Sequence, residues 1–128
     1  MRILLDTHTF LWWLENSSLL SARARDLIEN GDNVVFLSSA SGWEISIKAQ
    51  LGKLKLPATP ETFVTEQLFH HGFQSLSITM SHALHISNLP PLHRDPFDRL
   101  LIAQCQLEKI PIITADHLIT QYKVESIW

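Results

Sequence analysis

The chain has 128 residues, of which 45% are hydrophobic and 18% charged, and its formal net charge is −3. This composition predicts one folded domain over residues 1–128 and excludes a largely disordered chain. Its longest apolar run, residues 10–14, is too short for a membrane helix, and Asp6 interrupts the apolar N-terminus before a signal peptide could form. Cys105 is the only cysteine, which favours a reducing compartment, so we expect a soluble cytoplasmic protein.

Short apolar runs alternate with helical segments along the chain. The runs predict strands at residues 2–5, 34–37, 74–78, 111–114 and 124–128. Apolar spacing and capping residues predict helices at residues 7–15, 21–30, 41–53, 59–71, from 79 or 81 to 89, 95–109 and 117–122. Strands that alternate with helices predict an α/β fold, in which helices cover both faces of a mainly parallel sheet of about five strands.

Two acidic residues follow predicted strands. Asp6 comes directly after the first strand, and Asp116 follows the fourth by two residues. In open parallel sheets a ligand binds beyond the carboxyl ends of the strands, where the strand order switches. If these two strands are neighbours, both carboxylates face the same crevice, although each could simply cap the following helix. His8 and His117 lie close after these acids and are candidates for substrate contact.

Three further acids lie on or beside predicted helices. Glu44 borders a buried helix face, and its structural alternative is an ion pair with Lys48 that contributes roughly 0.2–0.5 kcal/mol. That gain is small beside the cost of burying a carboxylate. Asp95 precedes a proline, as a helix N-cap would. Asp98 then falls at the third helical position, where the helix dipole favours a carboxylate but Glu or Gln is more usual.

Asp6, Glu44, Asp98 and Asp116 together predict a metal site, provided that the fold brings them into one pocket. Crowded carboxylates repel one another unless a cation is present. Hard oxygen ligands suit Mg²⁺ or Mn²⁺, and no group of Cys and His has the spacing of a zinc site. The net charge argues against tight non-specific binding of nucleic acid, but only weakly against a nuclease, because a bound ion would offset these four charges.

Four strings carry a resemblance to a known family: LLDTH at 4–8, WEI at 43–45, RDPFDRLLIAQ at 94–104 and ITAD at 113–116. In this order and at these intervals they resemble the PIN-domain family, and specifically the VapC-type toxins of bacterial type II toxin–antitoxin systems. The resemblance covers nearly the whole chain and implies a three-layer α/β/α sandwich. The family's four acidic positions match Asp6, Glu44, Asp98 and Asp116, and Thr114 matches a hydroxyl position that helps to orient them.

The resemblance also implies an activity and partners. It implies an endoribonuclease in which Mg²⁺ or Mn²⁺ activates water to hydrolyse RNA, a homodimer, and a cognate antitoxin that blocks the site. Asp95 lies outside the four matched acids and is expected to cap its helix first and to support the site second. Lys48, Arg94 and Arg99 are candidate RNA contacts, each with an equally good explanation as a solvated helix residue. Residues 10–14 are apolar around the whole helix, which suits a core or an interface equally.

Two other functions stay open. A Mg²⁺-dependent phosphatase or nucleotidase would also place an acid after the first strand, but it would want a second acid two residues after Asp6, where His8 stands. A catalytically inert PIN-like module that only binds a partner is disfavoured by the complete set of four acids. The sequence does not specify the RNA target, because its recognition depends on loop shape and dimer geometry.

Overall fold

A parallel five-stranded sheet forms the centre of the computed structural model, which describes all 128 residues. Its strands are β1 Arg2–Leu5, β2 Val34–Ser38, β3 Gln74–Leu76, β4 Ile112–Ile113 and β5 Ser126–Ile127. They are arranged in the order β3-β2-β1-β4-β5, and every neighbouring pair is parallel. The prediction of an α/β fold with a parallel sheet of five strands is therefore confirmed, although β3, β4 and β5 are shorter than predicted.

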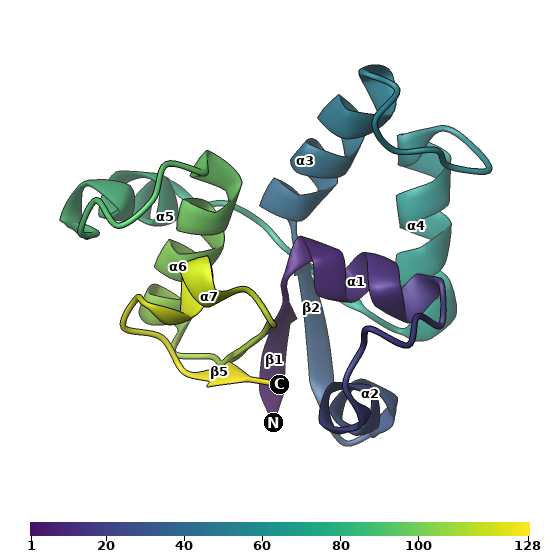
Figure 1. The fold of residues 1–128 in the computed structure, drawn as a ribbon, viewed down its shortest axis with the longest axis horizontal. Coiled ribbons are helices and arrows are strands. Elements are labelled where there is room, and N and C mark those ends of the chain that lie inside the picture. Colours follow the sequence, from purple (N-terminus) through teal and green to yellow (C-terminus); the bar gives the residue numbers. More distant parts are fainter.

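Helices cover both faces of this sheet. They are α1 Thr7–Leu14, α2 Ala22–Glu29, α3 Ser39–Gln50, α4 Pro60–His71, α5 Met80–His85, α6 Pro96–Glu108 and α7 His117–Thr120, with a 3-10 turn, η1, at Ile86–Asn88. Figure 1 shows α1, α2 and α4 on one side of the strands and α5, α6 and α7 on the other, while α3 rises beyond the carboxyl end of β2. None of these helices has the length and apolar character needed to cross a membrane.

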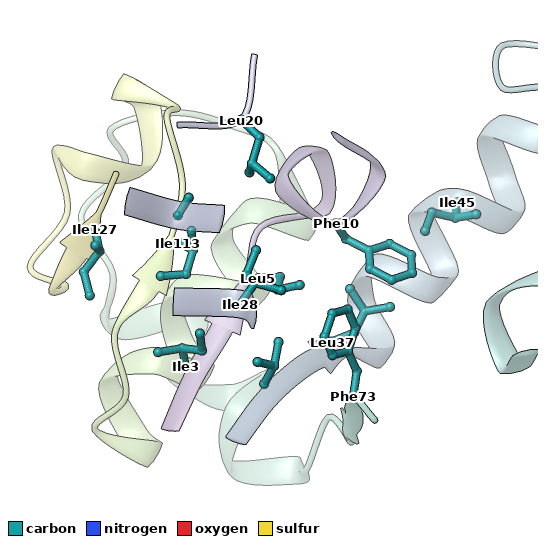
Figure 2. Close-up of a cluster of buried hydrophobic side chains, with 12 residues drawn as sticks. Ile3, Leu5, Phe10, Leu20, Ile28, Leu37, Ile45, Phe73, Ile113 and Ile127 are labelled. Carbon is teal, nitrogen blue, oxygen red and sulfur yellow. The ribbon is translucent and has the colours of Figure 1, made fainter. Parts of the chain in front are cut away.

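Alternating side chains of β1 build two separate hydrophobic cores. Ile3 and Leu5 join the core on the α1 and α2 side, which Figure 2 shows, whereas Leu4 joins the core beneath α6 and α7. Phe10 is fully buried in the first core, with its ring centroid 6.3 Å from that of Phe73. Residues 11–14 are partly buried and pack against the same core. Residues 10–14 thus contribute to the core, and an additional interface role for residues 11–14 stays a prediction.

The crossover connections change side at the centre of the sheet. The chain runs outward from β1 through β2 to β3, and then returns to the other side of β1 to form β4 and β5. β1 and β4 are hydrogen-bonded neighbours, with Leu5 in register with Ile113. Because parallel strands end at the same edge, Asp6 and Thr114 leave the sheet side by side at this switch in strand order. The condition set by the sequence, that the first and fourth strands be neighbours, is met.

The residue that directly follows helix α6 has an unfavourable backbone conformation. Lys109 has φ 56°, in the left-handed region, where an L-residue costs roughly 1–2 kcal/mol and glycine is the usual occupant after a helix. We expect Lys109→Gly to raise the free energy of unfolding by about 0.5 kcal/mol, because the greater freedom of glycine in the unfolded chain offsets part of the relief. Urea denaturation measures the change. The matched variant Lys123→Gly, without a positive φ to relieve, should not be stabilised.

Candidate active site

A small polar cavity of about 80 Å³ lies beyond the carboxyl ends of β1 and β4. No hydrophobic residue lines it. Its lining consists of Asp6, Thr7, His8, Glu44, Lys48, Asp95, Asp98 and Asp116. The structure therefore brings together all four acids of the predicted set, from the end of β1, from α3, from the first turn of α6 and from the start of α7. Five carboxylates and one lysine give the cavity a strongly negative charge.

Asp6 is the least exposed of the five acids that line the cavity, with 5% of its surface exposed. It occupies the N-cap position of α1, yet its side chain makes no capping hydrogen bond. Its Oδ2 instead accepts a hydrogen bond of 2.9 Å from the Thr114 hydroxyl, so the capping alternative for its side chain is wrong. Burial raises the pKa of Asp6, and the bond from Thr114 and the proximity of His8 only partly oppose this effect.

Thr114 joins the first acid of the cavity to the last. Its Oγ1 donates to Asp6 and accepts from the backbone N–H of Asp116, at 3.0 Å. Asp116 Oδ1 accepts from the N–H of Leu118 at 2.9 Å, so Asp116 does cap the short helix α7. The other carboxylate oxygen of Asp116 makes no hydrogen bond within the chain, which leaves it available to a ligand.

Glu44 reaches the cavity from α3 and is 6% exposed. Its Oε2 lies 2.7 Å from Lys48 Nζ, so the predicted ion pair one helical turn apart exists. The first turn of α3 is fixed against the first turn of α1 by a hydrogen bond of 2.7 Å between the Thr7 and Ser41 hydroxyl groups. The ion pair compensates part of the negative charge of the cavity, and the hydroxyl pair holds α3 beside Asp6.

Asp95 and Asp98 divide two tasks at the start of α6. Asp95 Oδ1 accepts from the N–H groups of Phe97 and Asp98 at 2.9 and 3.0 Å, which is the predicted N-cap. Asp98 Oδ2 lies 3.1 Å from His93 Nε2 rather than completing a capping box. Burial, followed by repulsion from Asp95 and then from Asp6 and Asp116, raises the pKa of Asp98 to about 7, against the opposing hydrogen bond from His93.

His93 and Tyr122 are the functional candidates that sequence reasoning missed. His93 lies in the loop before α6 and contacts both Asp98 and, through Nδ1 at 2.8 Å, the Tyr122 hydroxyl. The only sequence indication was the position of His93 two residues before a helix cap. Such a position occurs in many loops, and nothing in the sequence places Tyr122 beside it.

The predicted basic and histidine candidates lie in different places. Lys48 lines the cavity, and Arg94 is exposed next to Asp95. The Arg99 guanidinium does not line the cavity, because it donates to the carbonyl oxygens of Pro90 and Ile86 and to the Tyr122 hydroxyl. His8 lines the cavity with its ring stacked 6.0 Å from that of Trp12, whereas His117 is exposed and outside the lining.

The chemistry of these donors fits a hard divalent cation. Carboxylate oxygens are the ligands that Mg²⁺ and Mn²⁺ prefer. The pKa values of Asp6 and Asp98 are raised first by burial and then by nearby acids, and a bound cation would favour the charged form of both carboxylates. No group of three or more His, Cys, Asp or Glu side chains is already arranged around a common point as metal ligands.

A family model and two sequence relatives indicate the same protein family. Residues 3–125 match the family model described as PIN domain. The chain is 34% identical over 61 residues to Ribonuclease VapC16 of Mycobacterium tuberculosis, across 48% of this chain and 43% of that protein. It is 29% identical over 122 residues to Ribonuclease VapC22 of the same organism, across 94% of this chain and 92% of that protein. The chain thus spans less than half the length of the first relative in its alignment, and nearly all of the second.

Solved structures share the fold at low sequence identity. A VapBC2 complex from Rickettsia felis bound to a promoter DNA fragment has a TM-score of 0.73 and 12% identity, with 100% of this chain and 99% of that chain covered. DNA-bound VapBC from Salmonella typhimurium has a TM-score of 0.71 and 14% identity, with coverages of 99% and 97%. The family match over residues 3–125 and this shared fold confirm the resemblance that the four sequence strings indicated. The chain belongs to the PIN-domain family.

Proposed function

We propose that the chain is a metal-dependent endoribonuclease and the toxin of a toxin–antitoxin pair. Asp6, Glu44, Asp98 and Asp116 would hold Mg²⁺ or Mn²⁺. The observation that carries the proposal is that these four carboxylates line one cavity at the carboxyl ends of β1 and β4, in a chain of the PIN-domain family. RNA as the substrate rests on the relatives, both of which are named ribonucleases.

The residues around the cavity supply binding and orientation. When bound, the cation lowers the pKa of water and offsets negative charge on the phosphate. The Thr114 hydroxyl fixes one oxygen of Asp6, and Asp95 holds the first turn of α6. A carboxylate oxygen that is not used as a ligand can accept the proton of the attacking water. Such hydrolysis leaves a 5′-phosphate and a 3′-hydroxyl and needs no 2′-hydroxyl. Lys48, which lines the cavity, and Arg94, which is exposed next to Asp95 in the sequence, would contact flanking phosphates.

We further propose a homodimer that acts in the cytoplasm and is inhibited by a cognate antitoxin. The inhibiting partner is supported by two solved structures with this fold that are VapBC complexes, whereas the homodimer and the cytoplasmic location rest on the family resemblance. If the proposal holds, the product of a neighbouring reading frame should co-purify with this chain and suppress RNA cleavage. RNA cleavage that continues unchanged when the two proteins are mixed in equal amounts would count against this antitoxin.

The metal-dependent nuclease activity has a direct test. Protein purified without antitoxin and stripped of metal is incubated with bacterial RNA and, separately, with p-nitrophenyl phosphate. We expect RNA cleavage with Mg²⁺ or Mn²⁺, its loss on adding EDTA, and its return with excess metal. Hydrolysis of the phosphomonoester with RNA left intact would favour the phosphatase. No reaction with either substrate would favour the inert binding module.

A further inference from the structure

A chain of buried polar side chains continues from Asp98 away from the cavity. Asp98 Oδ2 lies 3.1 Å from His93 Nε2, and the His93 and Asp98 side chains are 8% and 13% exposed. His93 Nδ1 lies 2.8 Å from the hydroxyl of Tyr122, which is itself 3% exposed. Arg99 Nη1 donates to the same hydroxyl at 2.9 Å. His93, Tyr122 and Arg99 do not belong to the acidic set and do not line the cavity.

The donors around Tyr122 determine which nitrogen of His93 carries the proton. The phenolic oxygen accepts from Arg99 Nη1 at 2.9 Å and from the backbone N–H of His93 at 3.2 Å. Neither donor can accept a hydrogen bond, so the hydroxyl hydrogen is left to point at His93 Nδ1. Nδ1 is then the acceptor of the ring, and Nε2 carries the hydrogen that is donated to Asp98 Oδ2.

This arrangement orients the Asp98 carboxylate. Asp98 Oδ2 is held by its hydrogen bond with His93. Asp98 Oδ1 makes no hydrogen bond within the chain and remains available to a cation in the cavity. The loop that carries His93 is held in turn, because Arg99 donates to Pro90 O at 3.0 Å and to Ile86 O at 3.3 Å. Partners that orient a metal ligand in this way typically contribute 10- to 100-fold to metal affinity or activity.

We infer that His93 is a positioning residue for the cation site, held by Tyr122 and Arg99 so that it presents one oxygen of Asp98 to the cation. The inference rests on the proposed function, because it takes Asp98 as a ligand. It assigns a role to three residues outside the four matched acids. It also explains why Arg99 uses its guanidinium for carbonyl oxygens and Tyr122 instead of reaching the cavity.

The test compares Mn²⁺ affinity among folded variants, with free Mn²⁺ measured by electron paramagnetic resonance. We expect His93→Ala to weaken binding about tenfold or more and Tyr122→Phe, which keeps the ring but frees the tautomer, to weaken it less. His93→Gln should restore part of the affinity, because its amide can still donate to Asp98. The control is His85→Ala. His85, on α5, is hydrogen-bonded to Gln106 at 2.7 Å, and Gln106 lies on α6, the helix that carries Asp98. This variant should leave the Mn²⁺ affinity unchanged.

The outcomes separate the inference from the proposed function. Mn²⁺ binding by the wild type with equal affinity in His93→Ala and Tyr122→Phe overturns the inference and leaves the metal centre intact. Absence of Mn²⁺ binding by the wild type overturns both. Melting temperatures in EDTA show whether each variant is folded, and if His93→Ala is not, the comparison of His93→Gln and Tyr122→Phe with the wild type decides. Lower melting temperatures with unchanged affinity would assign His93 a purely structural role.

Discussion

Asp6→Asn is expected to reduce the rate of metal-dependent RNA cleavage by more than about 100-fold while the chain stays folded. Even residues that only orient a metal ligand contribute roughly 10- to 100-fold, so removal of a ligand's charge should exceed that range. The fold should tolerate the change, because the amide oxygen of Asn can still accept the hydrogen bond from the Thr114 hydroxyl. Rates are measured with a single RNA preparation at saturating Mg²⁺, and circular dichroism checks the fold.

Two matched variants make this result specific. Asp26→Asn removes the same charge from an exposed position on α2 and should leave the rate unchanged. Asp95→Asn lines the cavity but keeps its capping oxygen, since Asn is as good an N-cap as Asp, and should reduce the rate much less than Asp6→Asn. If Asp6→Asn cleaves RNA at the wild-type rate, the metal-site assignment is contradicted, regardless of the rate of Asp95→Asn.

The positions of Asp6 and Asp116 could be anticipated because they depend on one fact of topology. Apolar runs marked β1 and β4, and in a parallel sheet residues that follow neighbouring strands must share an edge. Glu44 could be anticipated from a conflict between its charge and a buried helix face. Asp98 depended on the family resemblance, because local capping rules alone did not require an acid there. Each of these arguments uses periodicity or the end of an element.

What the sequence could not predict depends on loop conformation. His93 and Tyr122 are 29 positions apart, and they meet only because the loop before α6 and the segment after α7 both turn back toward the start of α6. Periodicity carries no information about such an encounter. The capping alternative for Asp6 stayed open for a related reason: its local context equals that of a cap, and its actual partner, Thr114, lies 108 positions away.

The free energy of unfolding of the metal-free protein is expected to rise by about 2 kcal/mol as the pH falls from 8 to 5.5, since one pH unit corresponds to about 1.36 kcal/mol. The cause is Asp98, whose pKa is raised from an ordinary 3.8 to about 7 by burial and by Asp95, Asp6 and Asp116, against the His93 hydrogen bond. An acid with a raised pKa binds its proton more tightly in the folded chain. Stability therefore increases as the pH falls through 7, and it levels off near the ordinary pKa.

Asp98→Asn isolates this contribution. Without the charge, the metal-free variant should be more stable than the wild type at pH 8 and should lose most of the increase toward pH 5.5. The raised pKa of Asp6 acts in the same direction as that of Asp98, and the lowered pKa of His71 acts in the opposite direction below its ordinary value. Both groups are retained in the variant, so the difference between the two proteins reports Asp98. Urea denaturation in EDTA at both pH values measures this difference. An equal change in the free energy of unfolding between pH 8 and 5.5 in the two proteins would contradict the assignment.

Saturating Mg²⁺ should reverse the trend in the wild type. A cation binds the deprotonated carboxylates of the folded chain only, so it stabilises the protein most at pH 8, and protons displace it as the pH falls. Asp98→Asn should show little stabilisation by Mg²⁺ at either pH. The same carboxylate would then destabilise the empty protein and stabilise the loaded one, as expected if burial and crowding at the end of the sheet are retained for metal binding rather than for folding. A wild type with the same pH trend with and without Mg²⁺ would remove Asp98 from the proposed ligands.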